Sequence, residues 1–279
     1  MPGETGQSQF LGKIDPHSYP AAQAPDEPPA FRWNFANNKT YAYLFQQRVV
    51  SCFDLGSPSP TKQSMSANAG LLLKAKGDNT ADMFLKDMKA VMSMDFGSGE
   101  EKTMRSEIPA VVVQGVKEDG GMEVGSTGTE MLLKLLFPLP PKPLKVGEFA
   151  EIPLAMPFNA SGSVLQVKGA AKVTLTGYVT IEERLCARLE TQIDISKMEV
   201  PKEIKGSYAC TTRGKSVFYF DIKERAFVSG TMALLMQVRG DIPMPKVEID
   251  GEPLPPDMPK SSKIAMDNDN FIVIVRKAE

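Results

Sequence analysis

The chain has 279 residues, a formal net charge of -2 and a hydrophobic fraction of 42%. Acidic and basic residues are interspersed and form no basic face, so we expect no nucleic-acid partner. No apolar run approaches the ~20 residues of a transmembrane helix, and the first residues lack the charged and apolar regions of a signal peptide. The composition is ordinary for a globular protein with a sizeable core.

Residues 1–30 are predicted to be a disordered, proline-rich tether. Prolines recur from Pro16 to Pro29, and the residues between them offer little to bury. We expect residues 31–279 to form a single antiparallel β domain. Two meander halves, 31–150 and 151–279, are the alternative arrangement.

The first half of this domain is predicted to be strands joined by tight turns. Alternating apolar residues indicate strands over Tyr41–Phe53, Met65–Ala75 and Ala110–Lys117. Thr80–Met94 fits both a helix and a strand, and the tight turn before it, Gly77–Asn79, favours the strand. Phe96–Thr103 is expected to be a polar loop.

One short helix is expected, over Glu130–Phe137. Met131, Leu132, Leu135 and Leu136 share one face at helical spacing. The proline run that begins at Pro138 ends the helix. An edge strand broken by prolines is expected after it, from Ile152 to Phe158.

The longest pattern in the chain is Ala171–Ile195, whose odd positions are almost all apolar and whose even positions are polar. A strand of this length must fold back, and Glu183 is the only charge on the apolar face. We predict a hairpin with a three-residue turn at Glu182–Arg184. This turn keeps the parity of both arms, so Leu175 and Leu189 face the same core.

The last third of the chain is predicted to complete the sheet. Strands are expected over Ser207–Thr212, Ser216–Asp221, Phe227–Arg239, Ile264–Met266 and Phe271–Arg276, with turns at Arg213–Lys215 and Asp267–Asn270 and a loop over Gly240–Ser262. In total we expect roughly ten to thirteen strands and one helix. The fold class is therefore mainly β, either a large antiparallel meander sheet or a half-open barrel or sandwich.

The residues that usually carry chemistry are missing from the folded part. The single histidine, His17, lies in the predicted tether, so no histidine base is available for a Ser-His or Cys-His site. Gly214-Lys215-Ser216 lacks the earlier glycine of a phosphate-binding loop. We therefore expect no enzyme, and no catalytic, cofactor-binding or metal-binding residues.

The three cysteines, Cys52, Cys186 and Cys210, have no metal-binding spacing. Cys186 is expected on the solvent-leaning face of the hairpin and Cys210 in the next strand. A Cys186–Cys210 disulfide is one interpretation, but strict pairing puts these residues out of line. Free thiols are the favoured interpretation.

Several segments together resemble a family of uncharacterised exported bacterial proteins, many of them lipoproteins. The segments are Phe31-Arg32-Trp33-Asn34-Phe35, Leu136-Phe137-Pro138-Leu139-Pro140 with Val146-Gly147-Glu148, Leu175-Thr176-Gly177-Tyr178 with Cys186-Ala187-Arg188-Leu189, and Val217–Asp221 with Phe227–Gly230. Glu148-Phe149 departs from the acidic residue and tryptophan usual in that family. The resemblance implies export and an antiparallel fold, loosely similar to the half-barrels of lipoprotein and lipid carriers. It transfers no catalytic residue.

We therefore expect a non-enzymatic, extracytoplasmic binding protein, periplasmic or tethered to a membrane, whose ligand is a lipid or another apolar molecule. The 16 methionines suit such a ligand because their side chains adapt to irregular apolar shapes. Candidate lining residues are Leu175, Val179, Leu189, Met232 and Met236. The alternative is a structural or assembly subunit that docks a protein partner through exposed strand edges and the proline-rich segments 138–157 and 240–259.

Overall fold

The computed structural model describes residues 8–14, 18–36, 39–54, 59–95, 100–123, 127–160, 163–201, 204, 206–243, 248–249, 252–253 and 261–277. The strands are β1 (Ala21–Ala22), β2 (Thr40–Asp54), β3 (Thr61–Ala75), β4 (Thr80–Asp95), β5 (Glu101–Ile108), β6 (Val111–Lys117), β7 (Phe149–Ala160), β8 (Ser163–Ile181), β9 (Arg184–Met198), β10 (Ser207–Asp221), β11 (Ala226–Pro243), β12 (Glu248–Ile249), β13 (Glu252–Pro253) and β14 (Ser261–Arg276). The described helices are η1, a 3-10 turn over Leu11–Lys13, and α1 (Thr127–Leu136).

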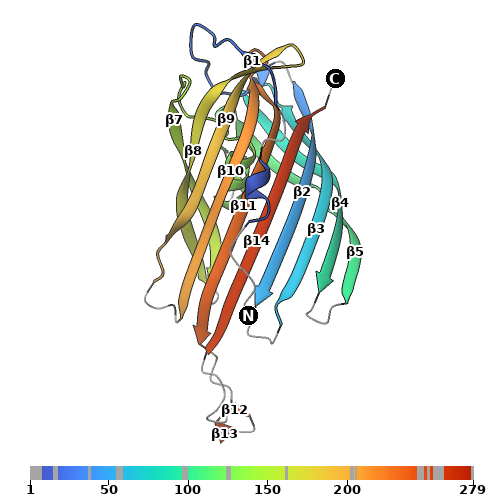
Figure 1. The fold of residues 1–279 in the computed structure, drawn as a ribbon, viewed down its shortest axis with the longest axis vertical. Coiled ribbons are helices and arrows are strands. Elements are labelled where there is room, and N and C mark those ends of the chain that lie inside the picture. The colour runs from blue at the N-terminus through green and yellow to red at the C-terminus, as the bar shows by residue number, and fades with distance from the viewer. Residues whose placement is uncertain are drawn as a thin grey trace.

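One 12-stranded antiparallel sheet organises the molecule, in the order β1-β8-β9-β10-β11-β14-β2-β3-β4-β5 (Figure 1). β6 lies beside β4 and β7 beside β8, so each lateral edge of the sheet carries two strands end to end. The sheet is open and curved, and its two edges do not pair with each other. The predicted fold class, a large antiparallel sheet with one helix, is confirmed.

The alternation of side chains explains why these segments are strands. In β3, Ala67, Ala69, Leu71 and Leu73 are buried, while the residues between them are half-buried or exposed. Thr80–Met94, for which the sequence allowed helix or strand, lies in β4 and pairs with β3 along most of its length. The predicted turn Gly77–Asn79 joins these two strands, with positive φ at Gly77 and Asn79.

The central hairpin forms, but its predicted turn is wrong. Ile181 pairs with Arg184, so the loop is only Glu182 and Glu183, and both have positive φ, 47° and 64°. This is the backbone of a two-residue type I′ turn. The register then shifts between Leu175 and Gly177. On the side of this shift away from the turn, Leu175 pairs with Leu189, and both are fully buried, as the alternation predicted.

Three other local predictions are wrong. Arg213–Lys215 lies inside the continuous strand β10, where Gly214 permits close packing because an added Cβ would meet Leu234 at 2.4 Å. Asp267–Asn270 lies inside β14, and the loop expected over Phe96–Thr103 already belongs to β5 from Glu101 onward. Pairing with neighbouring strands overrides the local turn propensity of these glycine, asparagine and aspartate residues.

Part of the segment expected to be a disordered tether lies against the outer face of the sheet. Ser8 donates a hydrogen bond to Asp269 at 2.7 Å, and the ring of Phe10 lies 5.6 Å from that of Phe271. Tyr19 makes an edge contact with Tyr219, with 4.9 Å between ring centroids. β1 then pairs with the upper end of β8. These contacts give the proline-rich segment apolar surface to bury, which its own sequence does not supply.

The main core lies on the concave face and is densest at the end where α1 crosses. The chain leaves one edge of the sheet at β6, passes through α1, and returns at the opposite edge as β7. Trp33 is fully buried at the centre of this end, with its ring 5.1 Å from Phe137 and 5.4 Å from Phe227. Side chains from α1, both edges and the central strands therefore share one hydrophobic cluster.

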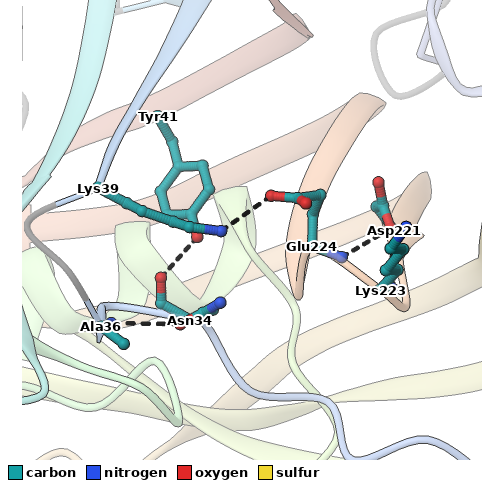
Figure 2. A network of polar contacts seen from close by, with 7 residues as sticks. All are labelled: Asn34, Ala36, Lys39, Tyr41, Asp221, Lys223 and Glu224. Atoms are coloured by element: carbon teal, nitrogen blue, oxygen red, sulfur yellow. Dashed lines mark hydrogen bonds and ion pairs between the residues drawn. The ribbon is translucent and has the colours of Figure 1, made fainter.

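Polar contacts fix the segment around Trp33 to the turn between β10 and β11 (Figure 2). Lys39 Nζ lies 3.0 Å from Glu224 Oε2, and this hydrogen bond holds the pKa of the Glu224 carboxyl below its ordinary value. Tyr41 donates its hydroxyl to the carbonyl of Asn34 at 2.5 Å. Asp221 accepts the backbone N–H of Glu224 at 2.9 Å, which orders the turn.

The hairpin turn gives a stability prediction. Replacing Glu182→Asn together with Glu183→Gly should raise the free energy of unfolding by about 1 kcal/mol, because both positions have left-handed backbone that glutamate disfavours. Urea denaturation measures this change. The control Gln192→Gly, in the exposed face of β9, should lower stability by about 0.5–1 kcal/mol. A destabilised turn variant would contradict the type I′ assignment.

Candidate functional site

The five residues expected to line an apolar site do not form one surface. Leu175, Leu189 and Met232 are fully buried in the main core. Val179 lies in a separate cluster with Cys186 and Tyr219, the cluster against which Tyr19 of the outer face packs. The irregularity in β8 turns Val179 away from the face of Leu175, which alternation alone could not reveal. Met236 is half-buried and lies next to the open part of the concave face.

On β14, β3 and β4, burial on the concave face decreases from the end covered by α1 toward the other end of the sheet, whereas Ser51 on β2 stays buried. In β3 the buried series ends at Ala67, and Met65 is only half-buried. In β4 the buried series ends at Ala90, and Met92 and Met94 are half-buried. The core therefore fills one end of this part of the concave face, and the other end keeps partly exposed apolar side chains.

Four of these side chains are methionines, and we call them the methionine face: Met65, Met92, Met94 and Met104. Met65 pairs with Met92, and Met92 pairs with Met104, so three methionines form one row across β3, β4 and β5. Alternation places Met92 on the same side as buried Ala90, which puts the row on the concave face. Met104 is 53% exposed, so solvent reaches the row from the edge of the sheet.

Amide side chains lie at and beside the end of this row on β2 and β14, and we call Gln47, Asn268 and Asn270 the amide row. Gln47 Nε2 donates to Asn270 Oδ1 at 3.1 Å, Asn270 donates to Asn268, and Asn268 Nδ2 donates to Ser51 Oγ at 2.9 Å. Each of these bonds uses one of two N–H groups on its amide. Asn270 connects to the methionine face through Val49, because Asn270 pairs with Val49 and Val49 pairs with Met65.

Two buried hydroxyl groups lie in the neighbouring row of the concave face. Thr191 pairs with Ser216, which pairs with buried Met232. Neither hydroxyl oxygen has a hydrogen-bond partner among the described protein atoms. A buried hydroxyl left without a partner costs about 1–3 kcal/mol, so these two positions are less favourable than apolar side chains of the same shape would be.

A depression of about 980 Å³ lies on the outer side of the sheet, where Leu11 of η1 faces strands β7 to β10. Its lining includes five basic side chains: Lys168, Lys172, Lys197, Arg213 and Lys215. Glu151 lies opposite Lys172 in the register, and Asp194 lies opposite Arg213. Such cross-strand pairs are typical of a solvated sheet surface, and they compensate two of the five positive charges.

The cysteines are all free thiols, so the disulfide considered from the sequence does not form. Cys186, expected to lean toward solvent, is fully buried. Burial raises the pKa of the Cys186 thiol to about 12 and that of Cys210 to about 11. Over the described residues, histidine, cysteine and carboxylate side chains form no cluster of three or more that could hold a metal ion.

Each segment predicted as a docking arm lies partly in the main sheet. Phe149–Pro157 belongs to β7, and Leu139 and Leu144, which precede it, are buried. Asp241–Pro243 ends β11, and the two short strands β12 and β13 pair with each other. The remainder of the second arm lies outside the described residues. None of the described helices has the length and apolar character needed to cross a bilayer.

Comparisons with known proteins give only weak similarities. No family model matches the chain, and no curated protein matches it. Among solved structures, the chain is similar to OpdQ of Pseudomonas aeruginosa, with 6% identity, a TM-score of 0.19, and coverage of 86% of this chain and 99% of that one. It is also similar to a DUF1329 family protein from Desulfovibrio piger, with 11% identity, a TM-score of 0.13, and coverage of 84% and 85%. Similarities this low assign no function, and the family expected from the sequence stays a prediction.

Burial of the thiols gives a prediction for their reactivity. At pH 8 a thiol-specific chromogenic reagent should label only Cys52 in the native protein, because burial holds Cys186 and Cys210 in the unreactive thiol form. The same reagent in denaturant should label all three cysteines. Rapid native labelling of a Cys52→Ser variant would contradict the burial of the other two.

Proposed function

We propose that the protein is a non-enzymatic binding protein for an amphipathic ligand with one long acyl chain. The observation that carries this proposal is the methionine face, a partly exposed apolar surface that continues from the filled core. Exposed apolar surface of this kind costs free energy in water, and an apolar ligand removes that cost. Methionine suits an acyl chain because its flexible thioether side chain adapts to the shape of its partner.

The register of the sheet supports a specific orientation of the ligand. The polar end lies at Asn270, whose amide belongs to the hydrogen-bonded amide row. The acyl chain then crosses Val49, Met65, Met92 and Met104 toward the β5 edge. These five residues occupy neighbouring strands, so the path spans about four strand spacings, or ~19 Å. One leaflet of a bilayer has a hydrocarbon thickness of ~15 Å, so the path accommodates an ordinary acyl chain.

The same proposal includes a location outside the cytoplasm. Its support is the sequence resemblance to exported bacterial proteins, which rests on segments such as Phe31–Phe35 and Val217–Asp221. A ligand would reach the open methionine face from solvent, as a protein that takes up acyl chains outside the cytoplasm requires. The non-catalytic part of the proposal rests on the side chains of the methionine face and the amide row, which are thioethers and amides rather than acids, bases or nucleophiles, although Lys102 lies opposite Met94.

Binding of a dansyl-labelled fatty acid to delipidated full-length protein tests this proposal. We expect saturable binding, and the double variant Met65→Lys, Met92→Lys should weaken it about tenfold or more, because two charges enter the acyl path. The matched control Leu44→Lys changes a residue that is 50% exposed on β2 and faces the other side of the sheet. Absence of saturable binding, or equal affinity in the double variant, would remove the proposal.

A second candidate function, an assembly subunit, is favoured by the edge strand β5. All its residues except half-buried Ile108 are exposed, and it pairs only with β4 in the described sheet. Antiparallel pairing with a second copy, centred on Ser106, would set Arg105 opposite Glu107 and Met104 opposite Ile108. Registers centred on Arg105 or on Glu107 would instead bring like charges together. Opposite charges and apolar pairs directly across a strand pair are stabilising.

Sedimentation velocity of the full-length protein tests this second candidate. We expect a dimer that Arg105→Glu dissociates and that the double variant Arg105→Glu, Glu107→Arg restores. Lys62→Glu, an exposed change on β3, serves as the control for altered net charge. A monomer at all concentrations, or a charge swap that fails to restore the dimer, would exclude this pairing.

A further inference from the structure

The described methionines of this protein differ in burial, and only some of them fill the core. Met83, Met88 and Met232 are buried at 3%, 8% and 0% exposure, as expected for side chains that fill a core. The methionine face differs, since Met104 is 53% exposed and Met65, Met92 and Met94 are half-buried. Core packing therefore accounts for the buried methionines and contributes at Met65, but it does not account for Met92, Met94 and Met104.

The register brings three of these thioethers together. Met92 lies directly opposite Met65 on β3 and Met104 on β5, with Cβ atoms ~4.5–5.5 Å apart in each pair, whereas Met65 and Met104 are two strand spacings, ~10 Å, apart. A hydrogen bond of 3.0 Å between Ser93 and Thr103, on the other side of the sheet, holds β4 and β5 in this register. Each methionine side chain has three rotatable bonds, so neighbouring sulfur atoms on this row reach a common point between them.

A common point for several thioethers is a site for a soft metal ion. Thioether sulfur is neutral and polarisable, and among biological metals it selects copper(I) over hard cations such as magnesium and calcium. Met104 leaves the row accessible from solvent, and buried Ala67 and Ala90 next to it shield the inner side. Small alanine side chains there also leave room for the longer methionine side chains.

The charges around the row define where an ion is tolerated. On the concave face Lys102 lies opposite Met94, so a cation is disfavoured beside Met94. The row of Met65, Met92 and Met104 is the next row on this face, and its nearest member to Lys102 is Met104, two residues along β5. Alternation directs Asp95, Glu101 and Arg105 to the opposite face. We propose that Met65, Met92 and Met104 form a copper(I) site, with thioether sulfur as the ligand from each of three adjacent strands.

This proposal goes beyond the acyl-binding function and does not depend on it. Substitution of methionine by leucine keeps the volume and apolar character of the face and removes only the sulfur. A leucine variant therefore separates the two ideas. It should lose copper(I) and keep the fatty acid, whereas the double variant Met65→Lys, Met92→Lys should lose copper(I) and bind the fatty acid more weakly.

Anaerobic titration of the full-length protein with copper(I), in competition with a chromophoric chelator, tests the proposal. The titration uses a Cys52→Ser background, because Cys52 is the one half-buried thiol and thiolate sulfur also binds copper(I). We expect one copper(I) per chain, and Met92→Leu, which removes the central ligand, should weaken binding by at least ~10–100-fold. Sulfur-only scattering in the copper X-ray absorption spectrum should accompany binding.

The control variant is Met131→Leu, a half-buried methionine on α1 outside the row. It should bind copper(I) as the Cys52→Ser protein does. Circular dichroism and urea denaturation verify that each leucine variant is folded. Absence of stoichiometric copper(I) binding, or binding that Met92→Leu leaves unchanged in a folded protein, would overturn the proposed site while leaving the acyl-binding proposal intact.

Discussion

The structure depends on filling the concave face of a curved, open sheet. The strands alone cannot bury that face, so other parts of the chain must cover it. Trp33 and Phe137 supply the covering at one end, one from the segment before β2 and one from the crossover after α1. Their rings meet Phe227 of the central strand β11, which joins both covering segments to the middle of the sheet. Burial of these large aromatic side chains supplies much of the hydrophobic stabilisation of this end.

The distribution of this covering creates the candidate site. The crossover segment reaches the end of the sheet where Tyr41 and Tyr43 of β2 are buried. Farther along the same strand, Gln47 and Val49 are only half-buried, and the neighbouring strands present the methionine face. The end covered by the crossover and the end that presents the methionine face are therefore built from the same strands. A ligand bound at the open end would extend the core that the aromatic residues begin.

Two kinds of ligand are proposed for one surface because methionine has two chemical characters. Its side chain is apolar and flexible, which suits an acyl chain, and its sulfur atom is a soft ligand for copper(I). The amide row of Gln47, Asn268 and Asn270 adds polar groups at one end of the acyl path only. The depression beside Leu11 is lined by basic side chains, two of which pair with Glu151 and Asp194, and it offers no comparable apolar surface for an acyl chain.

The sequence by itself determined the strand character of most segments, the single helix and the shared face of Leu175 and Leu189. These features follow from the alternation of apolar residues and the local spacing of a helix, which require no knowledge of distant neighbours. The methionine residues were visible in the sequence, but their grouping was not. Met65, Met92 and Met104 are far apart along the chain and meet only through strand register.

Only the tertiary structure decided the two-residue turn at Glu182 and Glu183, the position of Val179 on the outer face, and the continuation of β10 through Gly214. In each case pairing with a neighbouring strand determined the local backbone. One irregularity in β8 reverses the facing of every residue beyond it, because side chains alternate with a period of two. The order of segments in the sheet also decided which end was covered, since the sequence does not specify where the crossover lies.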